Sequence, residues 1–249
     1  ISPAMAPPPP LHVDDLGRPD YRAAWARQLA LVEERKTGGG ADRVLVVEHP
    51  HVFTLGRAQK ALANVLAPGD VEVIEIERGG DVTYHGPGQL VAYPIVDLRP
   101  DRCDVRRYVR DLAEVMIRLA SDHGIAAGYV QGFVGTWVFE EHPTTFDQAR
   151  AEDTLFDRGP HARLGKIGAI GVRLSRWVTM HGFAFNASTD LRGFGLIVPC
   201  GISGHGVTSL EALGKTPPPM RELAERASRH FARVFDCDVS FADEVASGG

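Results

Sequence analysis

The chain has 249 residues, of which 44% are hydrophobic and 24% charged, so it can bury a sizeable core and is not an extensively disordered protein. Its formal net charge of −5 argues against a general nucleic-acid binder, because there is no excess of cations to displace the counterions of a phosphate backbone. No apolar run approaches the roughly 20 residues of a transmembrane helix, and the 3 scattered cysteines indicate a reducing, cytoplasmic setting rather than a disulfide framework or a metal site.

The first hundred residues predict one helix followed by several strands. Pro19 and Gly38 bracket a helix over 19–36, because proline is favoured in the first turn of a helix and glycine just after its last turn. The side chains expected on its buried stripe are Tyr21, Ala24, Trp25, Leu29 and Val32. Runs of β-branched residues then predict strands at 44–47, 52–55, 71–77 and 90–96.

The second half predicts two further helices. Asp104 is a plausible N-cap for a strongly amphipathic helix that Gly124 ends. Residues 125–139 predict two strands, and 140–165 are expected to be a polar surface insertion because the segment is charged and interrupted by proline and glycine. Strands are expected at 166–174, 177–185 and 239–241, and a last helix at 220–235.

These elements indicate the fold class. Strands in runs, interrupted by three helices, predict a single α+β domain over 11–242, built on a mixed β-sheet with flanking helices. We expect a disordered, proline-rich start at 1–10 and a flexible tail at 243–249.

Four of the thirteen residues in 78–90 are glycine, and they flank Arg78 and His85. Glycine lacks the Cβ atom that keeps a backbone away from a ligand, and it adopts positive φ at little cost. The segment therefore predicts a backbone surface shaped around a bound group. The alternative is a pair of tight turns around a short strand.

Cys200 is a candidate nucleophile because it lies between Pro199 and Gly201, which indicate a sharp change of chain direction. A thiol at such a turn is exposed, and the amides after it can stabilise an oxyanion. The alternative is a small buried hydrophobe, the usual state of a free cysteine.

Lys166 is the candidate partner of this thiol. Only four of the 27 basic residues are lysines, and unlike arginine a desolvated lysine can lose its proton. Lys166 lies in an apolar, glycine-rich stretch, where its ammonium would favour the thiolate. His85 and His181 compete for this role, and His181 is equally well interpreted as a core histidine bonded to backbone.

Six segments in order resemble the octanoyltransferase family, also called lipoate-protein ligase B. They are 54–57 with Asn64 downstream, 78–90, 166–172, 179–186, 197–202 and 207–210. The resemblance runs from residue 11 to residue 240. It implies the α+β fold of the catalytic domains of biotin- and lipoate-protein ligases.

The resemblance also implies an activity, the transfer of an octanoyl group from acyl carrier protein to a lysine of a lipoyl domain. Cys200 and Lys166 are then the catalytic pair, with the acyl group held on Cys200 as a thioester. The implied substrate contacts are Arg78, Gly79, Gly80, Asp81, Val82, Thr83, Tyr84, His85, Ala169, Ile170, Gly171, Gly182, Phe183 and Ala184.

The expected partners are octanoyl-acyl carrier protein, the lipoyl domains of 2-oxoacid dehydrogenase complexes and the glycine cleavage H protein. We expect a monomer that uses no metal or organic cofactor and binds neither nucleic acid nor membrane. Since carrier proteins are usually acidic, we also expect a local basic surface, for which Arg106 and Arg110 on the 104–123 helix are candidates. The alternative there is an ordinary solvated helix face.

Two other functions compete with this one. An ATP-dependent lipoate- or biotin-protein ligase of the same fold would activate its substrate as an adenylate, but would leave the setting of Cys200 unexplained. A non-catalytic acyl-binding protein would keep the pocket without forming a covalent adduct. Segment 140–165 is longer than the family's usual connection, and we expect it to leave the site intact.

Overall fold

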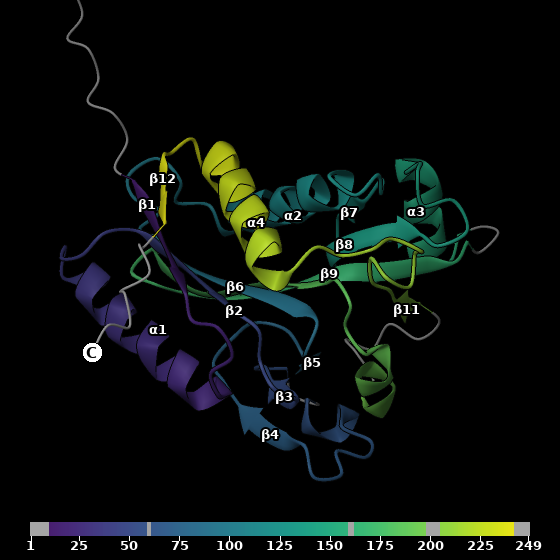
Figure 1. The fold of residues 1–249 in the computed structure, drawn as a ribbon, viewed down its shortest axis with the longest axis horizontal. Coiled ribbons are helices and arrows are strands. Elements are labelled where there is room, and N and C mark those ends of the chain that lie inside the picture. The colour runs from purple at the N-terminus through teal and green to yellow at the C-terminus, as the bar shows by residue number, and fades with distance from the viewer. Residues whose placement is uncertain (1–9, 59–60, 159–161, 198–204, 242–249) are drawn as a thin grey trace, which may run out of the picture.

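The computed structural model describes residues 10–58, 61–158, 162–197 and 205–241, and these form two sheets (Figure 1). The larger is a nine-stranded mixed sheet in the order β12-β1-β2-β6-β10-β9-β8-β7, with β11 paired to β9. Its strands are β1 (Leu11–Asp15), β2 (Arg43–Val47), β6 (Gln89–Ile95), β7 (Gly128–Val130), β8 (Phe133–Phe139), β9 (Leu164–Ser175), β10 (Val178–Asn186), β11 (Gly206–Val207) and β12 (Val239–Phe241).

A three-stranded sheet lies on the same side of the large sheet as the first helix (Figure 1). Its order is β4-β3-β5, with bounds β3 (Val52–Leu55), β4 (Glu72–Glu75) and β5 (Val82–His85). The helices are α1 (Tyr21–Lys36), α2 (Val105–Ser121), α3 (Gln148–Leu155) and α4 (Met220–Phe235), with 3-10 turns η1 (Leu62–Asn64) and η2 (Leu191–Leu196). The mixed sheet with helices on both faces confirms the predicted α+β class. In the described part of the chain, no helix is both long enough and apolar enough to cross a membrane.

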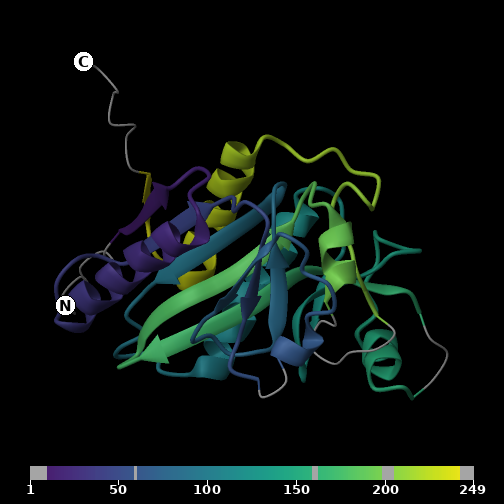
Figure 2. The same cartoon turned by 90° about the horizontal axis from the view of Figure 1, so that it is seen from below.

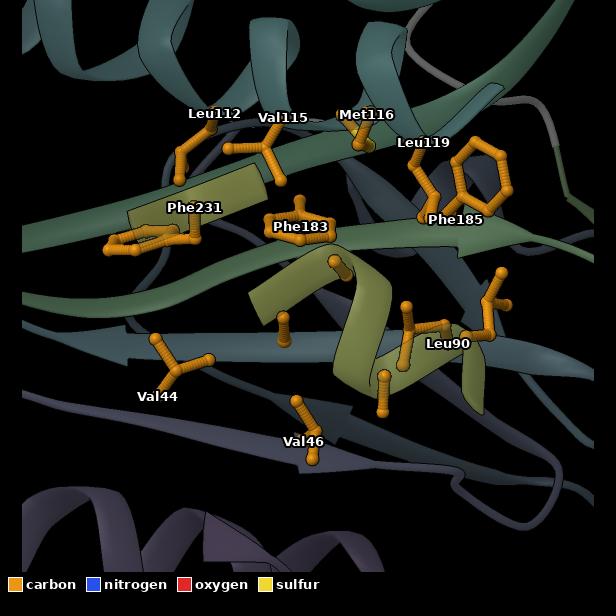
Figure 3. Packing of buried hydrophobic residues seen from close by; sticks show 14 of the residues in the cluster. Val44, Val46, Leu90, Leu112, Val115, Met116, Leu119, Phe183, Phe185 and Phe231 are labelled. Atoms are coloured by element: carbon orange, nitrogen blue, oxygen red, sulfur yellow. The ribbon is translucent and has the colours of Figure 1, made fainter. Parts of the chain in front are cut away.

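Helix α2 covers one face of the large sheet together with α4, whereas α1 crosses the opposite face (Figures 1 and 2). The Asp104 side chain caps α2 as predicted, by accepting hydrogen bonds from the amides of Arg106 and Arg107 at 2.8 and 3.0 Å. One face of the helix packs on aromatic side chains of β10, as Figure 3 shows. The residues of this contact are Leu112, Val115, Met116, Leu119, Phe183 and Phe185.

Helix α1 forms where expected, but its predicted buried stripe is partly wrong. Leu29 is 38% exposed, whereas Gln28 is completely buried. Gln28 replaces an apolar side chain because its Oε1 atom accepts a hydrogen bond from the His181 amide at 3.0 Å. A buried backbone N–H must find an acceptor, and hydrophobicity along one helix cannot show that need.

Segment 140–165, expected to be a polar surface insertion, contains regular secondary structure. It contains α3, whose Ala151 and Leu155 are buried, one turn apart, against Val130 and Trp137 of the β7–β8 hairpin. The predicted boundary is also wrong, because residues 164 and 165 already belong to β9. Strand β1 was not predicted at all. It is recognisable only through its parallel pairing with β2 and β12.

Two leucines test this packing. Leu112→Ala is expected to lower the free energy of unfolding by about 2–5 kcal/mol, because Leu112 is 0% exposed and its loss leaves a cavity. The matched control is Leu29→Ala, which is expected to cost less than about 1 kcal/mol. Urea unfolding followed by circular dichroism gives both values, and equal losses would contradict the assignment of the core face.

Candidate functional site

One cavity of about 630 Å³ brings together most of the residues singled out in the sequence. It lies where β9 and β10 meet the segment that leads into β5. The predicted site residues that line it are Lys166, Arg78, Gly79, Gly80, Asp81, Val82, Thr83, His85, Ala169, Ile170, Gly171, Gly182, Phe183 and Ala184. Cys200 lies outside the described residues.

The cavity borders an uncovered edge of β9. Strand β8 pairs with β9 only from Leu164 to Gly168, with an irregularity at Ile167. Gly135 marks the point where β8 leaves, since its φ is +136° and a Cβ there would lie 2.7 Å from the Gly168 carbonyl oxygen. Beyond Gly168, β9 remains paired to β10 on its other edge. Backbone groups at 169–171 therefore face the cavity instead of a neighbouring strand.

Arg78 fastens the glycine-rich segment beside this edge. Its guanidinium is buried and donates from Nη2 to the Thr54 carbonyl at 2.8 Å, while the Gly79 amide donates to the Val172 carbonyl at 3.0 Å. A Cβ atom on Gly171 would lie 2.8 Å from Cδ of Arg78. Gly171 is therefore required for the close approach of the arginine to β9.

Tyr84 is the predicted contact that does not line the cavity. It lies on β5 between Thr83 and His85, so strand alternation turns its ring to the other side. The ring packs on Phe53 and Phe194, and its hydroxyl hydrogen-bonds Nδ1 of His51 at 2.6 Å. Its surroundings are those of a core residue of the small sheet.

Lys166 occupies the cavity wall at the start of β9. Ile167 packs in the core and Lys166 lines the cavity, because neighbouring residues on a strand face opposite ways. Its Nζ atom lies 4.8 Å from the ring centroid of Trp137, a cation–π distance. Val207 of β11 pairs with Lys166 and also lines the cavity, so the chain that follows the segment containing Cys200 is held against this lysine.

The opposite part of the cavity contains a cluster of imidazole and phenol rings, of which sequence reasoning identified only two members. The members are Tyr21, His49, His85, Tyr93 and His181. All but His49 line the cavity. Tyr21, His49 and Tyr93 come from unrelated segments, and no motif in the sequence connects them.

The imidazoles of this cluster are neutral. Burial is the main cause that lowers the pKa of His49 to about 4 and the pKa values of His85 and His181 to about 3. The nearby Arg78 guanidinium lowers the pKa of His85 and His181 further. At neutral pH these rings are hydrogen-bonding groups and poor proton acceptors. His181 is buried, as one interpretation expected, but its ring makes no bond to described backbone.

No group of three His, Cys, Asp or Glu side chains in the described ranges is placed to hold a metal ion. The arrangement instead offers one lysine, a backbone edge and a partly apolar channel. Such a cavity suits an elongated, mostly apolar ligand.

Comparison with known proteins agrees with this geometry. Residues 20–232 match the model of the lipoyl protein ligase A/B catalytic domain. The octanoyltransferase of Solibacter usitatus is 46% identical over 230 residues, which cover 90% of this chain and 92% of that protein.

Solved structures show the same fold at low sequence identity. A bipartite lipoate protein ligase from Thermoplasma acidophilum is similar with a TM-score of 0.63 and 13% identity, over 96% of this chain and 89% of that one. The biotin protein ligase of Aquifex aeolicus is similar with a TM-score of 0.50 and 11% identity, over 90% of this chain and 70% of that one. At such low sequence identity, these two comparisons show only that this chain shares their fold.

His49 makes the ring cluster testable by pH. Because its pKa falls from about 6.5 in an unfolded chain to about 4, the unfolded state binds a proton that the folded state does not between these values. Stability is therefore expected to fall as the pH drops from 6.5 to 4. The free energy of unfolding of the wild-type chain should change more steeply with pH than that of His49→Gln, by up to about 1.4 kcal/mol per pH unit. Urea unfolding at several pH values measures both slopes, and equal slopes would refute the neutral buried state.

Proposed function

The chain belongs to the octanoyltransferase family, and on that premise we propose that it moves an octanoyl group from octanoyl-acyl carrier protein to a lysine of a lipoyl domain through a thioester on Cys200. The acceptors are the lipoyl domains of 2-oxoacid dehydrogenase complexes and the glycine cleavage H protein. The observation that carries the proposal is that Lys166 shares one cavity with residues of segments 78–85, 169–171 and 182–184.

In the first step, the Cys200 thiolate attacks the thioester carbonyl of the donor. The new carbon–sulfur bond forms as the bond to the carrier's sulfur breaks, and the leaving thiolate takes a proton from the Lys166 ammonium, which becomes neutral. One thioester replaces another, so the step needs no ATP. In the proposed pair, the ammonium of Lys166 favours the attacking thiolate.

In the second step, the neutral amine of the acceptor lysine attacks the acyl group on Cys200. An amide forms, Cys200 leaves as the thiolate, and Lys166 in its neutral form accepts the one proton that the amine loses. Two features support a lysine in this role. Lys166 is itself partly buried, and its Nζ atom lies over the adjacent Trp137 ring.

The apolar part of the cavity supports an alkyl substrate. Val91, Ile170 and Phe183 line it beside the β9 edge. Burial of each CH₂ group contributes about 0.8 kcal/mol of binding free energy. The affinity for an acyl chain is therefore expected to depend on how many of its CH₂ groups the cavity buries.

Helix α2 supports an acidic donor. Its Val109 lines the cavity, and Arg106 and Arg110 on the same helix are exposed to solvent. Arg107 lies 3.8 Å from Asp111, so part of this helix face is the mixed-charge surface that the alternative interpretation expected. The arginines expected on this surface were Arg99, Arg102, Arg106, Arg107 and Arg110, but Arg99 is paired with Asp97 and Arg102 with Asp111. We propose Arg106 and Arg110 as the cations that meet the carrier protein.

Trapping the acyl-enzyme tests the nucleophile. Incubation with octanoyl-acyl carrier protein, without ATP and without acceptor, is expected to add one octanoyl mass to the wild-type chain. Intact-mass spectrometry should find no adduct on Cys200→Ser, whereas Cys103→Ser and Cys237→Ser should load like the wild type. Strict dependence on ATP would favour the ligase function, and transfer by Cys200→Ser at the wild-type rate would overturn the assignment.

Lys166→Gln tests the proton acceptor. The variant is expected to lose about 100-fold or more in transfer to a lipoyl domain, since positioned acid–base groups contribute factors of this size. Single-turnover kinetics with preloaded enzyme isolates the second step. Lys215→Gln, which removes a half-buried loop lysine outside the cavity, serves as the matched control and should retain the full rate. Equal rates for the two variants would exclude Lys166.

A further inference from the structure

Lys166 lies directly opposite Trp137 in the β8–β9 pair, where the Cβ atoms of facing residues are about 5 Å apart. Its Nζ atom lies 4.8 Å from the centroid of the indole ring, and the stem of its side chain passes beside Gly135 of the same strand. A Cβ on Gly135 would be 3.1 Å from both Cδ and Cε of Lys166. Two positions of β8 therefore define the course of the lysine side chain, because glycine admits the stem and the indole lies against the ammonium.

The indole ring is itself held by packing and by a hydrogen bond. Trp137 is 1% exposed and belongs to the same buried cluster as Ala151 and Leu155 of α3. Its Nε1 atom donates to the Phe133 carbonyl at 3.0 Å, which fixes the orientation of the ring. The ring is thus a rigid surface for the lysine, and the helix of the 140–165 insertion helps to bury it.

Trp137 also contacts the chain that leads from the candidate nucleophile. His205 follows Cys200 by five residues and directly precedes β11. Its imidazole lies 6.3 Å from the indole, centroid to centroid, in a T-shaped arrangement that is favourable for aromatic pairs. One ring therefore joins Lys166 to the segment after Cys200.

The proposed reaction changes the charge of Lys166 twice. The lysine starts as an ammonium, becomes neutral when it protonates the leaving thiolate, and becomes an ammonium again when it takes the proton of the acceptor amine. An indole face attracts an ammonium through the negative charge of its π system, yet it has no carboxylate oxygen to take the proton. Such a ring favours the charged form and leaves the proton available for transfer. Trp137 is not among the described residues that line the cavity, so it acts on the substrate only through the lysine.

We propose that Trp137 is a positioning residue of the reaction, whose indole face holds the Lys166 side chain at the start of β9 and stabilises its ammonium form. The inference rests on the proposed function, because it concerns the same lysine and the same two steps. It implies that the charge of the lysine follows the electron density of the ring as well as its size.

Competitive acetylation of the free chain tests the charge effect without turnover. Acetic anhydride reacts with the neutral amine, so the pH of half-maximal labelling at Lys166, measured by peptide mass spectrometry, reports how strongly its ammonium is stabilised. Trp137→Leu is expected to lower this pH by about 0.5 to 1.5 pH units, and Trp137→Phe by less, since indole is the best of the aromatic faces for a cation. Lys215 in the same samples is the internal control and should not shift.

The direction of the shift separates the proposal from a packing role. A ring that only filled space would, when removed, let water reach the ammonium and move half-maximal labelling to higher pH or leave it in place. Either result would overturn the proposal. Substitution at position 137 leaves the other charged and titratable groups around the lysine unchanged, and these are Glu140, its partner Arg163, His205, and Arg78 and Asp81 of the cavity.

Fluorinated tryptophans guard against a folding defect, because they keep the shape of the ring and withdraw electrons from its face. Trifluorotryptophan at position 137 is expected to move half-maximal labelling of Lys166 to lower pH, and monofluorotryptophan should move it less in the same direction. The matched control is the same replacement at Trp177, a 38% exposed ring outside the cavity, which should leave Lys166 unchanged. Equal values for the native and the trifluorinated ring at position 137 would overturn the charge stabilisation.

Single-turnover transfer from preloaded enzyme tests the positioning. In Trp137→Leu, the maximal rate constant for transfer to a lipoyl domain is expected to fall about 10- to 100-fold, while the half-saturating concentration of the domain stays the same. Wild-type kinetics in this variant would overturn the positioning role. A wild-type chain that transfers no octanoyl group would instead overturn the proposed function, while the labelling still decides whether the ring stabilises the ammonium.

Discussion

The cavity depends on one incomplete strand pairing. If β8 continued along β9 beyond Gly168, its backbone would fill the space where 169–171 face the cavity. Gly135, whose φ is +136° and which has no room for a Cβ beside the Gly168 carbonyl, lies where β8 leaves β9. The Arg78 guanidinium and the Gly79 amide hold the glycine-rich segment at the far end of the gap. The remaining opening is bounded by backbone on one side and by a buried arginine on another. Small residues are therefore required where main chain and side chain come closest.

The two ends of the cavity have different chemistry. At one end, Lys166 lies over the face of Trp137 and beside the chain that leads from Cys200. At the other end, burial and the positive charge of Arg78 keep His85 and His181 neutral. The cavity therefore has a lysine at one end and uncharged polar rings at the other. Burial at the remote end disfavours the charged imidazolium form of the histidines. The neutral rings can still form hydrogen bonds there.

Individual elements show which sequence patterns were reliable. Helix α4 runs over the predicted residues 220–235, and α2 begins after its predicted N-cap, because both have strong apolar periodicity and clear ends. Helix α1 has weak periodicity, and its buried face depends on Gln28 satisfying an amide of a distant strand. Strand β1 and helix α3 are stabilised by partners elsewhere in the chain, so their short sequences carried too little signal.

The sequence alone determined the family, because the glycine-rich segment and the segments around Lys166 and Cys200 are local motifs in a fixed order. Tertiary structure decided which side chains reach the cavity. It turned Tyr84 into the small-sheet core, because neighbours on a strand face opposite ways. It also assembled Tyr21, His49, Tyr93 and His181 from separate elements. Such a cluster exists only once strands and helix are packed, since the contacts that create it join residues far apart in the chain.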